Sequence, residues 1–414
     1  MIFVRSASCA VLFATACYNP QFSEATECGP HGECPDHGHC NALHKCAPDA
    51  PDTGDAGAGS DDAEPASPCP GSFIKVCLND PNAAPQSLPS TDPLHPLKTS
   101  DSPLCLPASA YTATLANAAM LTTVDACVIV VEGTMSSSVT VTGSRPLILF
   151  SKTSLILSGT LDASSHQGGA PGPGANGECP PSQAADTGPL PVEDGGGGEG
   201  GSFGAKGGAG GDSFAAAAGG IAAAATAATT LRGGCSGGNG GGGNQNGGAA
   251  GNGGGAILVL AAQSLTLSGT ISASGAGGSG GGQFGDGGGG GGSGGMIVLD
   301  APLLQVAPTG QCFANGGGGG QGGTNQEATP GHPGAESSSP DSPGEGGSDA
   351  SVRGAGGAGG IANMPEHRLD GGTGGSASGA VGGGGGAGGS VGVIKIFPPS
   401  QSIVDRTRIS PDPS

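Results

Sequence analysis

Short apolar segments recur along this chain, separated by long glycine-rich stretches. Residues 155–164 (LILSGTLDAS) are repeated at 265–274 (LTLSGTISAS), and residues 255–260 are echoed at 295–300 and 392–397. An internal repeat with long insertions is typical of solenoids, in which each repeat stacks on the next. The sequence therefore predicts an all-β fold, a short parallel β-helix or solenoid over 128–404, with the glycine stretches as insertions.

The repeats also predict which way the strand side chains face. Lys395 is expected in solvent, so its neighbours on either side should point inward. The inward set is Ile257, Val259, Ile297, Leu299, Ile394 and Ile396. Leu258 and Val298 then point outward although both are apolar, which is typical of a sheet covered on both sides. We expect the glycine arms to be that cover.

Two states of the glycine arms are compatible with their composition. Glycine loses more backbone entropy on ordering than any other residue, which favours disordered linkers. The alternative is an ordered bundle of polyproline-II-like strands, with three residues per turn, packed through their glycine faces. Spacings such as GGAGG at 207–211 and 356–360 suit this bundle. The arm at 324–350, rich in Ser, Pro, Glu and Asp, is the one most expected to be disordered.

The N-terminus predicts export. Arg5 precedes a short apolar stretch in a predicted signal peptide over 1–16. Ala14-Thr-Ala16 fits ordinary signal peptidase cleavage, which would give a secreted protein. With Cys17 the same residues resemble a bacterial lipobox, so the sequence predicts an outer-membrane or cell-surface lipoprotein held to the membrane by a lipid on Cys17.

Residues 17–46 form a predicted cysteine-rich module. Cys28, Cys34, Cys40 and Cys46 are spaced by six residues in a short polar stretch. Such spacing in an exported chain predicts two disulfides that staple a module without an apolar core, and it leaves three pairings open. Zinc is the alternative because four histidines lie among these thiols, but the two-to-four-residue spacing of zinc knuckles is missing.

The later cysteines also predict disulfides. Cys69 and Cys77 are close enough to close a small loop, Cys105 and Cys127 bracket the entry to the first apolar strands, and Cys179 and Cys235 lie in the longest glycine-rich insertion. If Cys17 carries a lipid, Cys312 is left without a predicted disulfide partner, and we expect it to be a small buried hydrophobic residue.

Composition divides the rest of the chain and excludes some partners. Residues 47–68 are predicted to be an acidic flexible linker, 69–127 a loop-rich cap, and 405–414 a polar tail. The net charge of −20 repels phosphate backbones, so we expect no nucleic-acid partner. The chain contains 2 Tyr, 10 Phe and no Trp, which leaves few aromatic platforms for ligands.

No catalytic, cofactor or metal motif stands out. Matches to Gly-x-Gly-x-x-Gly carry little information in a chain with 90 glycines, and no tandem calcium-binding repeat is present. Asp162, Asp286 and Asp300 are an alternative acidic cluster on one face, as in polysaccharide-cleaving enzymes, but solvated turn or strand residues are the favoured interpretation because no basic partner recurs beside them. His166 and His332 are interpreted as lone loop histidines. We therefore expect no catalytic residue, no metal site and no cofactor.

Several segments together carry a resemblance to one group of proteins. They are residues 17–22 with the evenly spaced cysteines, 102–105, 159–166, 231–235, 313–319 and 392–397. The chain resembles uncharacterised, glycine-rich predicted lipoproteins of myxobacterial type over nearly its whole mature length. The resemblance implies export and anchoring but no activity.

The expected function is a non-catalytic cell-envelope or surface protein, structural or adhesive, with envelope or matrix polysaccharide as a possible partner. The alternatives are a β-helical enzyme acting on polysaccharide and a glycan- or ligand-recognition module.

Overall fold

The computed structural model describes residues 38–40, 46–48, 69–116, 122–187, 194–242, 247–324, 329–348, 353–362, 369–378, 382–398 and 408–414. The chain divides into two units, Met1–Ala63 and Glu64–Ser414. In the first, β1 (Gly38–Cys40) and β2 (Cys46–Pro48) pair in antiparallel fashion, with Cys40 and Cys46 as register partners. Cys17, Cys28 and Cys34, and the side chains of Cys40 and Cys46, lie outside the described residues, so the lipid anchor and the two N-terminal disulfides stay predictions.

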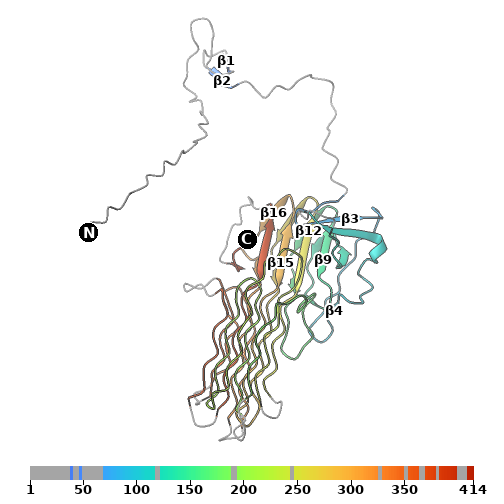
Figure 1. Ribbon diagram of the computed structural model, residues 1–414. Coiled ribbons are helices and arrows are strands. Elements are labelled where there is room, and N and C mark those ends of the chain that lie inside the picture. Colours follow the sequence, from blue (N-terminus) through green and yellow to red (C-terminus); the bar gives the residue numbers. More distant parts are fainter. Residues whose placement is uncertain are drawn as a thin grey trace, which may run out of the picture. The chain divides into compact units, whose positions relative to one another are not determined.

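The second unit contains three parallel sheets that the chain visits in turn (Figure 1). The five-stranded sheet contains β6 (Cys127–Val130), β9 (Leu147–Ser151), β12 (Ala256–Ala261), β15 (Met296–Asp300) and β18 (Val393–Phe397). The four-stranded sheet contains β7 (Gly133–Met135), β10 (Ser154–Leu157), β13 (Ser264–Leu267) and β16 (Leu303–Val306).

The six-stranded sheet contains β4 (Leu97–Lys98), β8 (Val139–Thr142), β11 (Thr160–Asp162), β14 (Thr270–Ser272), β17 (Gln311–Phe313) and β19 (Ile409–Ser410). Repeated residues stand opposite one another: Ile257 is the register partner of Ile297, which in turn partners Ile394. A separate antiparallel pair lies in the predicted cap and consists of β3 (Ile74–Leu78) and β5 (Tyr111–Leu115). A short 3-10 helix, η1 (Ala108–Ala110), comes directly before β5.

The predicted fold class, an all-β parallel β-helix over 128–404, is wrong. Between β11 and β12, β14 and β15, and β17 and β18, the chain leaves the sheets in long insertions, 163–255, 273–295 and 314–392, whose described residues hold only isolated bridges. Each insertion runs back and forth, and each of its extended runs is called an arm. These arms take up more of the span than the strands do. Glycine explains the difference, because it offers no side chain to pack on the faces of a sheet. Parallel sheets are usually covered by helices, but the only helix among the described residues is the short η1, so other parts of the chain must cover these sheets.

Two hydrophobic cores lie on opposite faces of the five-stranded sheet, and they confirm the predicted facing of the apolar residues. Lys395, predicted in solvent, is instead partly buried, with its Nζ atom 5.5 Å from the centre of the Phe73 ring. One core contains the whole predicted inward set, Ile257, Val259, Ile297, Leu299, Ile394 and Ile396. The other contains Leu258 and Val298, both fully buried. One strand therefore sends alternate side chains into two separate cores, as the period of two requires.

The cover over Leu258 and Val298 differs from the prediction. It consists largely of the β3–β5 pair, whose Ile74, Val76 and Tyr111 belong to the same core. The arms add Phe203 and Leu231, so they contribute two of their rare large apolar side chains rather than a glycine surface. The segment predicted as a loop-rich cap thus supplies most of the cover, because glycine has little apolar surface to bury.

The glycine arms are ordered and bonded to one another, as the bundle prediction requires. The N–H groups of Gly287, Gly288 and Gly289 donate to carbonyls on three different arms, those of Gly241, Gly384 and Ser279. The next three donors, Gly290, Gly291 and Gly292, return to the same three arms at Gly238, Ala387 and Ala276. Hydrogen bonding therefore repeats every three residues, which is the period of polyproline II.

The arm at 286–295 occupies the centre of this bundle. Its carbonyls at Gly287, Gly288 and Gly289 accept from three further arms, through the N–H groups of Gly248, Gly198 and Gly320. Six arms thus surround the central one, and every backbone group of the stretch 287–292 has a partner. Because the bonds satisfy buried backbone groups, the bundle needs no sheet ladder.

The central position explains the unbroken run of glycine at 287–292. A Cβ on Gly290 would lie 1.8 Å from the carbonyl oxygen of Glu199. Outer arms instead place many residues in solvent, and most of these are small or polar, for example Ala209, Asn239, Ala249, Ala355 and Thr373, with Ile221 and Leu369 as exposed apolar exceptions. The prediction that 324–350 is disordered is wrong for 329–348, which bond to the bundle through Gly334 and Gly347.

Candidate functional site

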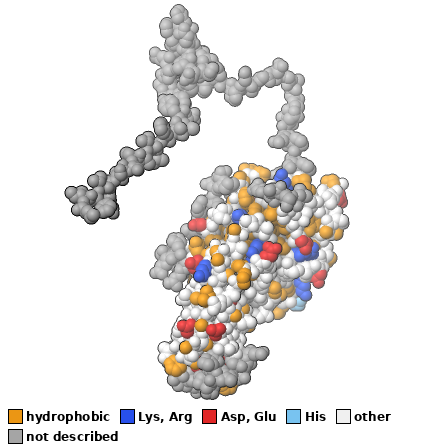
Figure 2. Space-filling model, viewed as in Figure 1, with side chains coloured by type: hydrophobic (Ala, Val, Ile, Leu, Met, Phe, Trp, Pro, Cys, Tyr) orange, Lys and Arg blue, Asp and Glu red, His pale blue; other side chains and the backbone are white. Residues whose placement is uncertain are grey.

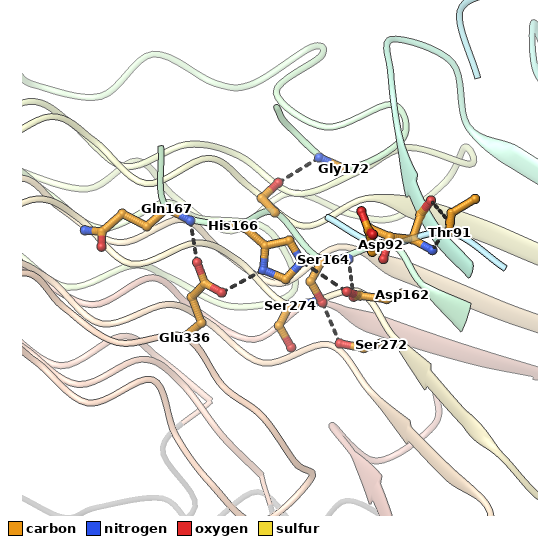
Figure 3. A network of polar contacts seen from close by, with 12 residues as sticks. Thr91, Asp92, Asp162, Ser164, His166, Gln167, Gly172, Ser272, Ser274 and Glu336 are labelled. Atoms are coloured by element: carbon orange, nitrogen blue, oxygen red, sulfur yellow. Dashed lines mark hydrogen bonds and ion pairs between the residues drawn. The ribbon is translucent and has the colours of Figure 1, made fainter. Parts of the chain in front are cut away.

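Three ionisable side chains, Asp162, His166 and Glu336, form a carboxylate–imidazole–carboxylate clamp (Figure 3). The His166 Nε2 atom lies 3.0 Å from Asp162 Oδ2, and its Nδ1 atom lies 2.8 Å from Glu336 Oε2. The second carboxylate oxygen of Glu336 accepts from the backbone N–H of Gln167. The three side chains are about one fifth to one third exposed, so solvent reaches the clamp from one side.

The clamp holds its histidine in the charged state. Hydrogen bonds to Asp162 and then to Glu336 raise the pKa of His166 to about 10, against the opposing effect of partial burial. At neutral pH both ring nitrogens therefore carry protons and donate them to carboxylates. An imidazolium with both protons engaged has no lone pair to act as a general base.

Neighbouring serines do not complete a nucleophilic site. The Ser164 hydroxyl lies 2.5 Å from the Ser272 hydroxyl and accepts from the Ser274 N–H, while its own N–H donates to Asp162 Oδ1. The Ser164 hydroxyl therefore bonds to residues at and just after the end of β14, and not to His166. A Ser–His–Asp relay needs the base to contact the nucleophile, and here the histidine contacts carboxylates alone among the described residues.

The clamp joins two parts of the fold. Asp162 ends β11, and His166 follows four residues later where the chain enters its first arm. Glu336 lies in the 329–348 segment, 170 residues away from His166. The interpretation of His166 as a lone loop histidine is therefore wrong. The Asp162–His166 spacing was a signal in the sequence, but no local pattern could have predicted Glu336.

We expect the clamp to stabilise the fold in a pH-dependent way. A histidine whose folded pKa of about 10 exceeds its unfolded value of 6.5 contributes stability in full below pH 6.5 and loses it as the pH rises toward 10. The melting temperature of His166→Gln should therefore lie furthest below that of the wild type at pH 6 and converge with it near pH 10. His95→Gln, at an exposed histidine beside Asp92, is the matched control. A difference between wild type and His166→Gln that grows with pH would contradict the clamp.

The acidic cluster considered from the sequence does not form. Asp162 belongs to the six-stranded sheet, Asp300 ends β15 in the five-stranded sheet, and Asp286 begins the central arm of the bundle. No group of three or more His, Cys, Asp or Glu that could hold a metal occurs in the part of the chain that the structure describes. Asp162 contacts His166, and Asp300 Oδ2 accepts from the backbone N–H groups of Ser72 and Phe73. Asp286 and Asp300 are both buried, so the interpretation of these two as solvated turn residues is wrong.

Three predicted disulfides are present. Cys69 bonds to Cys77, Cys105 to Cys127, and Cys179 to Cys235. Cys312 is a free, buried thiol, as predicted, and burial raises its pKa. The Arg232 guanidinium lies 4.9 Å from the centre of the Phe203 ring and donates to Cys235 Sγ, so it covers the third disulfide on one side. The Cys105–Cys127 bond joins the cap to β6 of the five-stranded sheet, whereas the other two bonds close loops within the cap and within the 163–255 insertion.

The end of the bundle furthest from the sheets carries two exposed phenylalanines, which we call the tip. Phe284 is 56% exposed and lies in the turn before the central arm, and Phe214 is 52% exposed. The Phe214 N–H donates to Gly382 at the start of the arm that leads into β18, and the next residue, Gly383, contacts Gly285. One arm therefore separates the two aromatic residues.

Backbone conformation at the tip is unusual. Phe284 has a φ of +77° and Ala216, two residues after Phe214, has a φ of +63°. A bulky residue avoids positive φ, and such a conformation costs about 1–3 kcal/mol. Asp186 and Asp212 are exposed, and both bond to backbone shortly after Phe214: the Asp186 N–H donates to the Ala218 carbonyl, and Asp212 Oδ1 accepts from the Gly219 N–H. Figure 2 shows acidic side chains next to hydrophobic ones toward the end of the bundle. Sequence reasoning missed the tip because Phe214 and Phe284 each stand alone among small residues.

Comparisons with protein-family models, with curated proteins and with solved structures find no match to this chain. No helix among the described residues has the length and apolar character needed to cross a membrane.

Proposed function

We propose that the chain is an exported, non-catalytic surface protein, anchored through a lipid on Cys17, whose glycine bundle presents an adhesive tip. The observation that carries the proposal is the pair Phe214 and Phe284 at the tip. Exposing two large aromatic rings costs solvation free energy, and holding Phe284 at positive φ adds strain. Exposed apolar side chains that are kept at such a cost mark an interaction site, so we infer that the tip binds a partner.

The bundle supports this proposal through its rigidity. Each arm is bonded to neighbours at three-residue intervals, so the tip is held by backbone hydrogen bonds along the whole arm. A binding residue on a rigid element loses less entropy on contact than one on a loose loop. Along the outer arms most exposed residues are small or polar, and the large apolar ones, Ile221 and Leu369, are aliphatic, so the two aromatic rings of the tip are the part suited to a partner.

A neutral polysaccharide of the envelope or matrix is the partner that we propose for the tip. Aromatic faces bury the apolar faces of sugar rings, and Gln283, exposed beside Phe284, offers a polar group for hydroxyls. The net charge of −20 disfavours anionic polymers. The enzyme alternative lacks support from the clamp, because His166 has both nitrogens engaged.

The proposal is tested on cells that carry the wild-type chain or the Phe214→Ser, Phe284→Ser double variant. We expect the double variant to reach the surface in equal amount, measured by whole-cell labelling, and to lose most of the adhesion to a polysaccharide-coated surface under flow. Leu94→Ser, at a residue 85% exposed in the cap, is the matched control and should adhere like the wild type. Equal adhesion of all three would contradict the adhesive role, and failure to label any of them would contradict surface location.

A further inference from the structure

A cavity of about 560 Å³ opens where residues 70–72 and the last residue of β3, Leu78, meet the ends of β9, β12 and β15. Its floor is a register row of the five-stranded sheet: Phe150 partners Leu260, and Leu260 partners Asp300. Its walls are mostly apolar and include Pro70, Leu78, Pro81, Ala262, Pro302 and Pro398. The volume and the apolar lining are those of a small-molecule site.

One carboxylate stands in this apolar wall. Asp300 is 3% exposed and takes the place that Leu260 and Phe150 fill on the neighbouring strands. Its Oδ2 atom lies 2.5 Å from the Ser72 N and 3.1 Å from the Phe73 N. Burial raises the pKa of the Asp300 carboxyl, and the hydrogen bonds from Ser72 and Phe73 oppose this rise.

Among the described residues, Asp300 has hydrogen-bond donors but no positively charged partner. None of the ion pairs among them involves Asp300. Lys152 also lines the cavity, but its Nζ atom is held 3.0 Å from each of the carbonyl oxygens of Pro81 and Ala83. A buried carboxylate without a counter-charge is costly, and a cation that reaches it recovers part of that cost.

We propose that this cavity binds a small amphipathic amine, with the ammonium group at Asp300 and the apolar body against Leu260, Phe150 and the prolines. The two backbone N–H groups fix one oxygen of the carboxylate and so orient the group for a second, charged partner. The apolar walls exclude a strongly hydrated metal ion, which would lose its water without replacement ligands. This site is separate from the tip and does not depend on the proposed adhesive function.

The test compares three probes of equal chain length, n-hexylamine, 1-hexanol and hexanoate, by isothermal titration calorimetry on the intact chain at neutral pH. We expect hexylamine to bind about tenfold tighter than the other two, as a charge-assisted hydrogen bond in a partly buried site provides. Asp300→Asn should bind hexylamine no better than hexanol. Hexylamine affinity should also fall as the pH drops and Asp300 takes up a proton, while hexanol affinity stays constant.

A second variant keeps the proposal falsifiable if Asp300→Asn fails to fold. Ala262→Phe leaves Asp300 in place and fills the cavity, so it should abolish binding of hexylamine and hexanol alike. Equal affinities for the three probes, tighter binding of hexanoate, or hexylamine binding that survives in Ala262→Phe would each overturn the proposal. Tighter binding of hexanoate would indicate that Lys152 recognises the ligand. Hexylamine binding that survives in Ala262→Phe would indicate that the amine binds on another surface.

Discussion

Replacing Gly290 with alanine should lower the free energy of unfolding of the Glu64–Ser414 unit by about 3 kcal/mol, at the upper end of overpacking effects. The added methyl would lie 1.8 Å from the carbonyl oxygen of Glu199 and 2.5 Å from its carbonyl carbon. The backbone of Glu199 cannot rotate away as a flexible side chain does, so the arms that contain Gly290 and Glu199 must move apart. Their separation would also strain the bond between the Gly290 N–H and the Gly238 carbonyl.

Chemical denaturation of Gly290→Ala and of Gly177→Ala measures this effect. Gly177 is exposed, and a Cβ there would meet its nearest atom, the Gly174 carbonyl oxygen, only at 3.9 Å. We expect the control to change stability by about 0.5 kcal/mol or less. Equal, small effects in both variants would mean that the arms are loose and that the close approach at Gly290 is not maintained.

Replacing Leu258 with aspartate is expected to cost more than the about 2–5 kcal/mol of a Leu→Ala change in a core. Leu258 is fully buried between the five-stranded sheet and its cover, and it packs in the core that contains Ile74 and Phe203. The variant removes that packing and also places a carboxylate without a partner in an apolar layer. Loss of the folded baseline in circular dichroism near room temperature is the expected observation.

Ile156→Asp is the control for that prediction. Ile156 lies in β10 between two buried leucines but is itself 41% exposed. Its replacement should cost about 1 kcal/mol or less, which reflects strand propensity rather than core packing. If Leu258→Asp is as mild as Ile156→Asp, the outer face of the five-stranded sheet is open to water and the β3–β5 cover is absent.

Strand positions and their facing were predictable from the sequence because they depend on local alternation. Lys395 identifies one face, and the internal repeat transfers that assignment to β12 and β15. Disulfide partners inside the second unit were predictable for a related reason, since Cys69–Cys77, Cys105–Cys127 and Cys179–Cys235 each join cysteines adjacent in the cysteine order.

The overall fold class was not predictable, because it depends on what the arms do collectively. A single GGx stretch has the same composition in a loose linker and in a bundle, and only the contacts with six neighbours distinguish the two states. The same limit applies to the clamp and to the tip. Glu336 reaches His166 across 170 residues, and Phe284 acquires meaning only because its turn lies at one end of the bundle.

Amide hydrogen exchange at Gly287 to Gly292 tests the central feature of the molecule, its hydrogen-bonded glycine bundle, most directly. These six amides all donate to neighbouring arms and belong to buried residues. We predict protection equal to that of the amides of β12 and β15, because opening any of them requires several arms to separate together. Exchange at the rate of an unstructured peptide at these glycines, with the strands still protected, would contradict the bundle and with it the rigid support of the tip.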